Sequence, residues 1–151
     1  MKILYDHQIF AQQSYGGISR YFCELMNHFS TDPSVEFTLS IRFSNNHYIR
    51  HAEFGRHFWF TRPRYWKYDR LNNFFQQHLR SGVYDILCQN QNLSISHLKK
   101  QGFDVFHPTY YDPYFLFYIC KKPFVLTVHD RIHEIFPQHF PKNDTISMHK
   151  K

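Results

Sequence analysis

Short apolar segments alternate along this chain with segments whose large side chains recur at helical spacing. Lys2–Tyr5 is the first apolar run, and residues 18–29 then repeat apolar side chains on one helical face. Residues 35–41 alternate apolar with polar side chains, as a half-buried strand does. A strand, a helix and a second strand in this order form a β-α-β unit, which restricts the chain to folds with a parallel sheet.

The rest of the chain continues this alternation. We expect helices over residues 65–79, 92–100 (closed by Gly102) and 113–119, and strands over residues 103–106 and 124–128. For residues 83–87 the pattern fits a strand or a buried loop equally well. Near-continuous apolar strands must be covered on both faces, so the pattern predicts a doubly wound, Rossmann-like parallel sheet of the α/β class. No repeat or linker divides residues 1–151, which predicts one domain.

The composition indicates the compartment in which such a domain works and the charge of its partner. The 151 residues suffice for one core, and the three cysteines are far apart and suggest neither a disulfide framework nor a thiolate zinc site. No apolar run approaches the length of a membrane span or a signal peptide, so we expect a cytoplasmic protein. The net charge of +6 and the aromatic content of 20% favour an anionic partner, which phosphorylated small molecules, lipid surfaces and nucleic acids all satisfy.

Polar and glycine residues follow several of the expected strands. Parallel sheets place ligands beyond the carboxyl ends of their strands. Residues 6–7, Gly16 and Gly17, residues 107–109, and residues 129–130 should all lie at that edge. Two glycines at a helix N-terminus allow a close approach of backbone N–H groups to a phosphate, although two glycines also serve as a plain turn.

Candidate chemistry at this edge rests mainly on His129 and Asp130. An imidazole after a strand can exchange a proton with a bound hydroxyl at neutral pH, and Asp130 can orient it. Alternatively, His129 hydrogen-bonds a neighbouring carbonyl, or His129, Asp130 and His133 hold a metal, although no further well-spaced ligand accompanies them. His107 before a proline also reads as a turn, and the pair Tyr110 and Tyr111 either lines the crevice or packs.

Cations and aromatic rings interleave in residues 56–70. The side chains most suited to an anionic surface are Arg62, Arg64, Trp66 and Lys67. Such a mixture fits lipid headgroups or single-stranded nucleic acid, and it fits equally a basic helix whose rings pack inward.

Four blocks of this chain resemble the N-terminal domain of GT-B glycosyltransferases of the family 4 type, which include bacterial surface-polysaccharide enzymes. The blocks are residues 3–6 (ILYD), 15–22 (YGGISRYF), 103–112 (FDVFHPTYYD) and 126–130 (LTVHD), the last followed by His133 and Glu134. They occur in the expected order and span both ends of the chain. Residues 43–102 carry no resemblance.

The resemblance implies transfer of a sugar, with retention of configuration, from a nucleotide-sugar to an acceptor hydroxyl of a glycan or a lipid-linked intermediate. It implies no metal and no cofactor besides the nucleotide-sugar. By resemblance, Gly16, Gly17 and Arg20 contact the donor diphosphate, and His129 and Asp130 border the reacting sugar. The acceptor side would include His107, Tyr110, Tyr111, His133 and Glu134, and the basic segment would touch the inner face of a membrane.

The chain departs from this family in length. A complete enzyme is more than twice as long, and its second domain supplies most contacts to the nucleotide. A helix start near Asn143 that stops at Lys151 also suggests a missing continuation. We therefore expect the isolated chain to be inactive, as a fragment, a truncated product or half of a split enzyme. The alternative function is a nucleic-acid-binding module, and a metal-dependent hydrolase ranks third. In the preferred interpretation, as a glycosyltransferase domain, we expect no nucleic acid partner.

Overall fold

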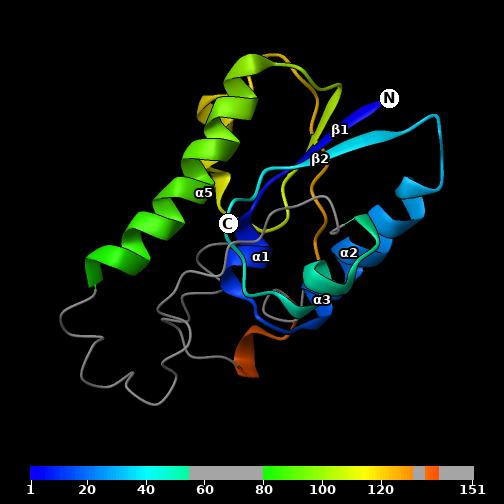
Figure 1. Ribbon diagram of the computed structural model, residues 1–151. Coiled ribbons are helices and arrows are strands. Elements are labelled where there is room, and N and C mark those ends of the chain that lie inside the picture. Colours follow the sequence, from blue (N-terminus) through cyan, green and yellow to red (C-terminus); the bar gives the residue numbers. More distant parts are fainter. Residues whose placement is uncertain (55–79, 131–134, 140–151) are drawn as a thin grey trace.

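The computed structural model describes residues 1–54, 80–130 and 135–139, and the sheet within them has three parallel strands (Figure 1). Strand β1 is Lys2–Tyr5, β2 is Glu36–Leu39 and β3 is Val105–His107, in the order β2-β1-β3. Ile3 of β1 is paired with Phe37 on one side and with Val105 on the other. The predicted strand at the N-terminus is confirmed, and the strands predicted over residues 35–41 and 103–106 are present with shifted ends.

Helices connect these strands. They are α1 (Gln8–Gln12), α2 (Gly17–Ser30), α3 (His47–His51) and α5 (Arg80–Lys100), with the 3-10 helices η3 (Pro113–Phe117) and η4 (Pro137–His139). The predicted helix over residues 18–29 is confirmed as α2. Helices α1 and α3 span five residues each, too short for a helical period to appear in the sequence. The predicted helix over residues 65–79 lies outside the described residues.

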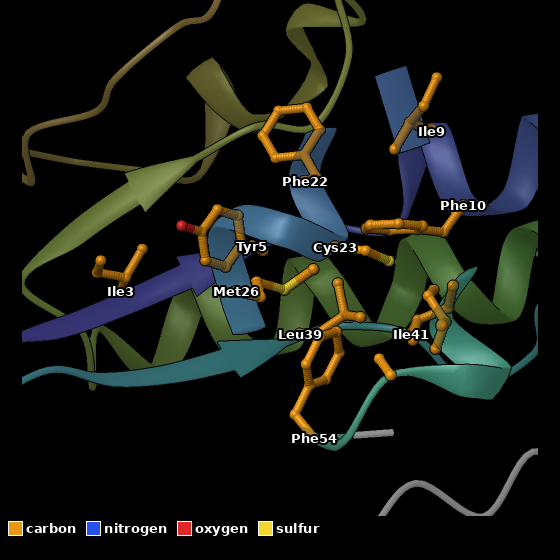
Figure 2. Packing of buried hydrophobic residues seen from close by; sticks show 12 residues of the cluster. Ile3, Tyr5, Ile9, Phe10, Phe22, Cys23, Met26, Leu39, Ile41 and Phe54 are labelled. Carbon is orange, nitrogen blue, oxygen red and sulfur yellow. The ribbon is translucent and has the colours of Figure 1, made fainter. Parts of the chain in front are cut away.

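Apolar side chains cover both faces of the sheet. Successive strand residues point to opposite faces, so Tyr5 joins a cluster with Phe22 and Met26 of α2, while Leu4 joins one with Leu98 of α5. Figure 2 shows the first cluster, and Figure 1 shows α2 and α5 on opposite sides of the strands. The fold is therefore α/β, with a small parallel sheet between helices, and is compatible with a Rossmann-like architecture.

Helix α5 corrects two predictions. Residues 83–87, left open between strand and loop, are helical, and the helix expected over residues 92–100 begins at Arg80. The helix also stops differently, because Gln101 adopts the left-handed conformation at φ 54° and Gly102 does not. The Gln101 side chain donates a hydrogen bond to the Leu98 carbonyl of the last turn, which stabilises this end.

Residues 124–128 are not the buried strand that their apolar sequence predicts. Phe124 forms one parallel bridge with Phe106, and the Val125 N–H donates to the Phe106 carbonyl at 2.9 Å. The chain then leaves the ladder, and the side chains from Phe124 to Val128 include four large apolar ones that are 45–52% exposed. An apolar sequence shows that a segment could be buried. Whether it is buried depends also on a neighbouring element that covers it.

Candidate functional site at the carboxyl edge

The order of the strands defines a switch point between β1 and β3. The chain passes from β1 to β2 on one side and later returns to β3 on the other side of β1. Ligands of open α/β sheets bind beyond the carboxyl ends of the strands at such a point. Asp6 and His7 follow β1 there, and Pro108 and Thr109 follow β3.

The Asp6 carboxylate joins the two strand ends. It is fully buried, and it accepts hydrogen bonds from the Thr109 N–H at 2.9 Å and the Thr109 hydroxyl at 2.7 Å. The Gln8 amide at 2.8 Å and the Tyr114 hydroxyl at 3.1 Å also donate to it. With its lone pairs occupied in this way, Asp6 holds the edge together and does not face a ligand.

His7 and Ser94 form a pair that has the elements of a nucleophilic dyad. The His7 Nδ1 lies 2.8 Å from the Ser94 hydroxyl, and burial lowers the pKa of His7. Ser94, however, is fully buried, and its hydroxyl donates to the Ser40 carbonyl at 3.2 Å. A nucleophile must reach a substrate, so this buried pair does not act as a catalytic dyad. Its role is to fasten α5 to the sheet.

His107 is buried at the carboxyl edge of the sheet. Its ring centroid is 5.3 Å from that of Tyr5 and 5.2 Å from that of Phe22, and its Nε2 lies 2.8 Å from the Thr127 hydroxyl. The pKa of His107 is lowered to about 4, chiefly by burial; nearby Asp6 opposes this shift and His129 adds to it. The imidazole is therefore neutral at pH 7.

His129 meets the first turns of α2. Its ring lies 5.5 Å from the Tyr21 ring and 5.7 Å from the Phe22 ring, with edge-on geometry. The His129 N–H donates to the Tyr111 hydroxyl at 2.9 Å, which fixes the backbone at this position. His129 is half-buried, and Asp130 beside it is exposed.

Tyr110 and Tyr111 have different surroundings. Their rings lie 4.8 Å apart, but Tyr110 packs against the cluster under α2, whereas Tyr111 holds the backbone of His129. The structure thus brings together four of the residues expected at this edge, which are His107, Tyr110, Tyr111 and His129.

Helix α2 begins at the same edge with an open N-terminus. Gly16 stands at the N-cap without a side-chain hydrogen bond, and the first turn holds no acidic residue. A Cβ at Gly16 would lie 2.4 Å from Oε1 of Gln13, whereas a Cβ at Gly17 would meet nothing within 4 Å. The helix dipole and the backbone N–H groups of this turn can attract an anion. Arg20 is exposed one turn on and pairs with Glu24 at 3.8 Å.

Several predicted site residues lie outside the described residues. They are His133, Glu134, Arg62, Arg64, Trp66 and Lys67. Within residues 1–54, 80–130 and 135–139, no three His, Cys, Asp or Glu side chains are grouped to hold a metal ion. None of the helices in that same part of the chain is long and apolar enough to cross a membrane.

A surface depression of about 160 Å³ lies at the other end of the sheet. Lys2 and Glu36, at the starts of β1 and β2, line it together with Lys100 and Gly102 near the end of α5. None of the residues predicted to be functional lines this depression.

Three residues that hold the predicted histidines at the carboxyl edge were missed by sequence reasoning. Tyr21 and Phe22 contact His129, and Thr127 holds His107. All three belong to the blocks of the resemblance, so the blocks themselves carried a signal. Their helical or strand spacing favoured a packing role and gave no reason to assign them to the site.

Comparisons with protein-family models, with curated proteins and with solved structures found no match to this chain.

Proposed function

We propose that this chain is the acceptor-side, N-terminal domain of a retaining GT-B glycosyltransferase, one half of a doubly wound two-domain architecture. One observation carries the proposal. The His129 ring packs on Tyr21 and Phe22 of α2, the helix that Gly17 begins, at the carboxyl edge of a parallel sheet. A diphosphate site and a proton-exchanging group from distant parts of the sequence therefore share one edge, as transfer from a nucleotide-sugar requires.

In this mechanism the first turn of α2 holds the donor diphosphate. Gly17 leaves the space beyond its Cα open, so phosphate oxygens can approach the N–H groups of the turn. Arg20, exposed one turn on, adds positive charge. Charge that develops on the leaving diphosphate is stabilised by donors already oriented toward it.

The imidazole of His129 and the exposed carboxylate of Asp130 act on the reacting sugar and the acceptor hydroxyl. Tyr111 fixes the backbone of His129, and the rings of α2 fix the orientation of its side chain. His107, neutral and buried nearby, adds no charge on the acceptor side. His133 and Glu134 complete the acceptor side in this proposal.

A second domain must close the other side of the cleft. Transition-state stabilisation depends on groups placed around the developing charge, and one half of the cleft supplies few of them. The isolated chain therefore binds ligands weakly and does not turn over. We place it in the cytoplasm, in contact with the inner membrane face through Arg62, Arg64, Trp66 and Lys67.

The diphosphate assignment is tested by a charge reversal at Gly17. In amide NMR spectra, UDP-glucose and inorganic pyrophosphate should shift the signals of Gly17, Ile18 and Ser19. Gly17→Asp should abolish these shifts, because its carboxylate occupies the expected phosphate position. The open space beside Gly17 predicts that the variant folds normally.

Gly102→Asp is the matched control. A Cβ at Gly102 would also meet nothing within 4 Å, and Gly102 lies at the opposite end of the sheet. The substitution adds the same charge and should leave the shifts unchanged. If both substitutions weakened the ligand-induced NMR shifts equally, the change in net charge would explain the effect. That result would refute a diphosphate site at α2.

A further inference from the structure

Beside the α2 N-terminus, the exposed ring of Tyr15 is part of an ordered aromatic cluster. Its ring stacks on that of Tyr48 at 5.0 Å and 28°, and the His47 ring lies 5.9 Å away at 59°. Tyr15 remains 71% exposed in this arrangement. One face of its ring is thus supported while much of the side chain is open to solvent, which costs free energy that burial would recover.

Hydrogen bonds fix the two segments that carry these rings. The fully buried Asn46 donates from Nδ2 to the Gln13 carbonyl at 2.7 Å, and the His47 N–H donates to the Ser14 carbonyl at 2.8 Å. Asn46 Oδ1 also caps α3 by accepting from the Tyr48 N–H at 3.0 Å. The loop before α2 and the start of α3 are therefore tied together, and the stacked rings are held in place before any ligand arrives.

Polar groups surround the rim of this stack. The pKa of Tyr48 is raised, chiefly by its hydrogen bond with Tyr15, and the nearby Arg20 guanidinium opposes the shift. Two phenol hydroxyls, an exposed imidazole and a guanidinium therefore accompany the exposed Tyr15 ring. A flat apolar face rimmed by donors and acceptors matches a pyranose ring, whose C–H groups cover one face and whose hydroxyls point outward.

We infer that Tyr15, stacked on Tyr48 beside His47, is a binding subsite for a sugar ring of an oligosaccharide acceptor. The inference rests on the proposed function and specifies its acceptor as a glycan chain. Small molecules prefer concave sites that enclose most of their surface, whereas a ring this exposed suits a chain lying across the surface. Single-stranded nucleic acid would need a row of cations along its phosphates, whereas the pKa of Tyr48 responds to one cation, Arg20.

The test compares Tyr15→Ala and Tyr15→Phe with the unmodified chain. Maltotriose, cellotriose and triacetylchitotriose are titrated separately and followed through the aromatic NMR signals of Tyr15 and Tyr48. At least one trisaccharide should bind, with affinity reduced about tenfold by Tyr15→Ala, as loss of one ring stack predicts. Tyr15→Phe keeps the ring and should retain most of the affinity.

Phe117→Ala is the matched control, because Phe117 on η3 is an aromatic side chain that is even more exposed than Tyr15, at 86%. It should not change trisaccharide binding. Absence of binding by all three trisaccharides, or equal loss in Tyr15→Ala and Phe117→Ala, would overturn the subsite. Binding of oligothymidylate that depends on Tyr15, without trisaccharide binding, would overturn it in favour of nucleic acid.

The pyrophosphate response at Gly17 separates this test from that of the proposed function. Trisaccharide binding at Tyr15 without any response to pyrophosphate would retain the sugar subsite and remove the donor site. The reverse result would retain the donor site and remove the subsite.

Discussion

At residue 107, an imidazole packs against two aromatic rings and is held by one hydroxyl. Tyr5 and Phe22 contact the His107 ring, and Thr127 bonds its Nε2. From the sequence, this histidine before a proline read as either a ligand contact or a turn. Its packing among rings was decided by α2, an element that comes much earlier in the chain.

Protonation of His107 should destabilise the fold at acidic pH. Burial lowers its pKa to about 4 from 6.5, so the unfolded chain binds the proton more tightly than the native protein. Stability is therefore highest above pH 6.5 and falls as the pH drops toward 4, with His107 accounting for about 2 kcal/mol by pH 5. Urea denaturation at pH 7 and pH 5 measures this loss.

His107→Gln should make that fall in stability shallower, because glutamine can bond Thr127 but does not titrate. His7 and His97 also have lowered pKa values, so part of the fall persists in the variant. An identical pH dependence in both proteins would show that His107 titrates normally in the native state.

Among the elements, those whose periodic pattern extends over many residues could be predicted from the sequence. Helix α2 repeats its apolar positions over 14 residues, and its predicted bounds differ from the observed ones by one residue at each end. Helix α3 has only five residues, and its signal was limited to the capping residue Asn46. Helix α5 was predicted at less than half its length, because polar residues interrupt its apolar face.

Asn46→Ala should cost about 2 kcal/mol of unfolding free energy. It removes the cap of α3 and the buried hydrogen bond to the Gln13 carbonyl, each worth about 1 kcal/mol. Asn45→Ala replaces the same residue type at an exposed neighbouring position and should change stability by less than about 0.5 kcal/mol. Urea midpoints compare the two, and similar losses would show that Asn46 does not tie α3 to the preceding loop.

For the whole molecule, contacts at both ends of β1 join the first residues of the chain to residues 104–114. Asp6 bonds Thr109 and Tyr114, and the start of β1 bonds Asp104 through the Lys2 N–H at 2.7 Å. These contacts hold β1 and β3 side by side across the switch point. The proposed donor and acceptor groups depend on this alignment.

Asp6→Asn should destabilise the protein by about 3 kcal/mol. One carboxylate oxygen becomes an N–H₂ group, which faces either the two Thr109 donors to Oδ1 or the Gln8 and Tyr114 donors to Oδ2. That pair of buried donors is left without an acceptor. Asp104→Asn makes the same change at an exposed carboxylate and should cost less than about 1 kcal/mol. The two are compared by urea denaturation, and an Asp6 variant as stable as the Asp104 variant would contradict the role given to this carboxylate.

The sequence by itself determined the alternation of strands and helices, the parallel class of the sheet and the arrival of His107 at its carboxyl edge. These features follow from local periodicity and from the rule that the carboxyl ends of parallel strands share an edge. Tertiary structure alone decided that Asp6 and His107 are buried and bonded, that the apolar side chains of residues 124–128 are exposed, and that Tyr15 stacks on Tyr48. Burial and stacking depend on which distant element lies opposite a side chain, and no local pattern contains that information.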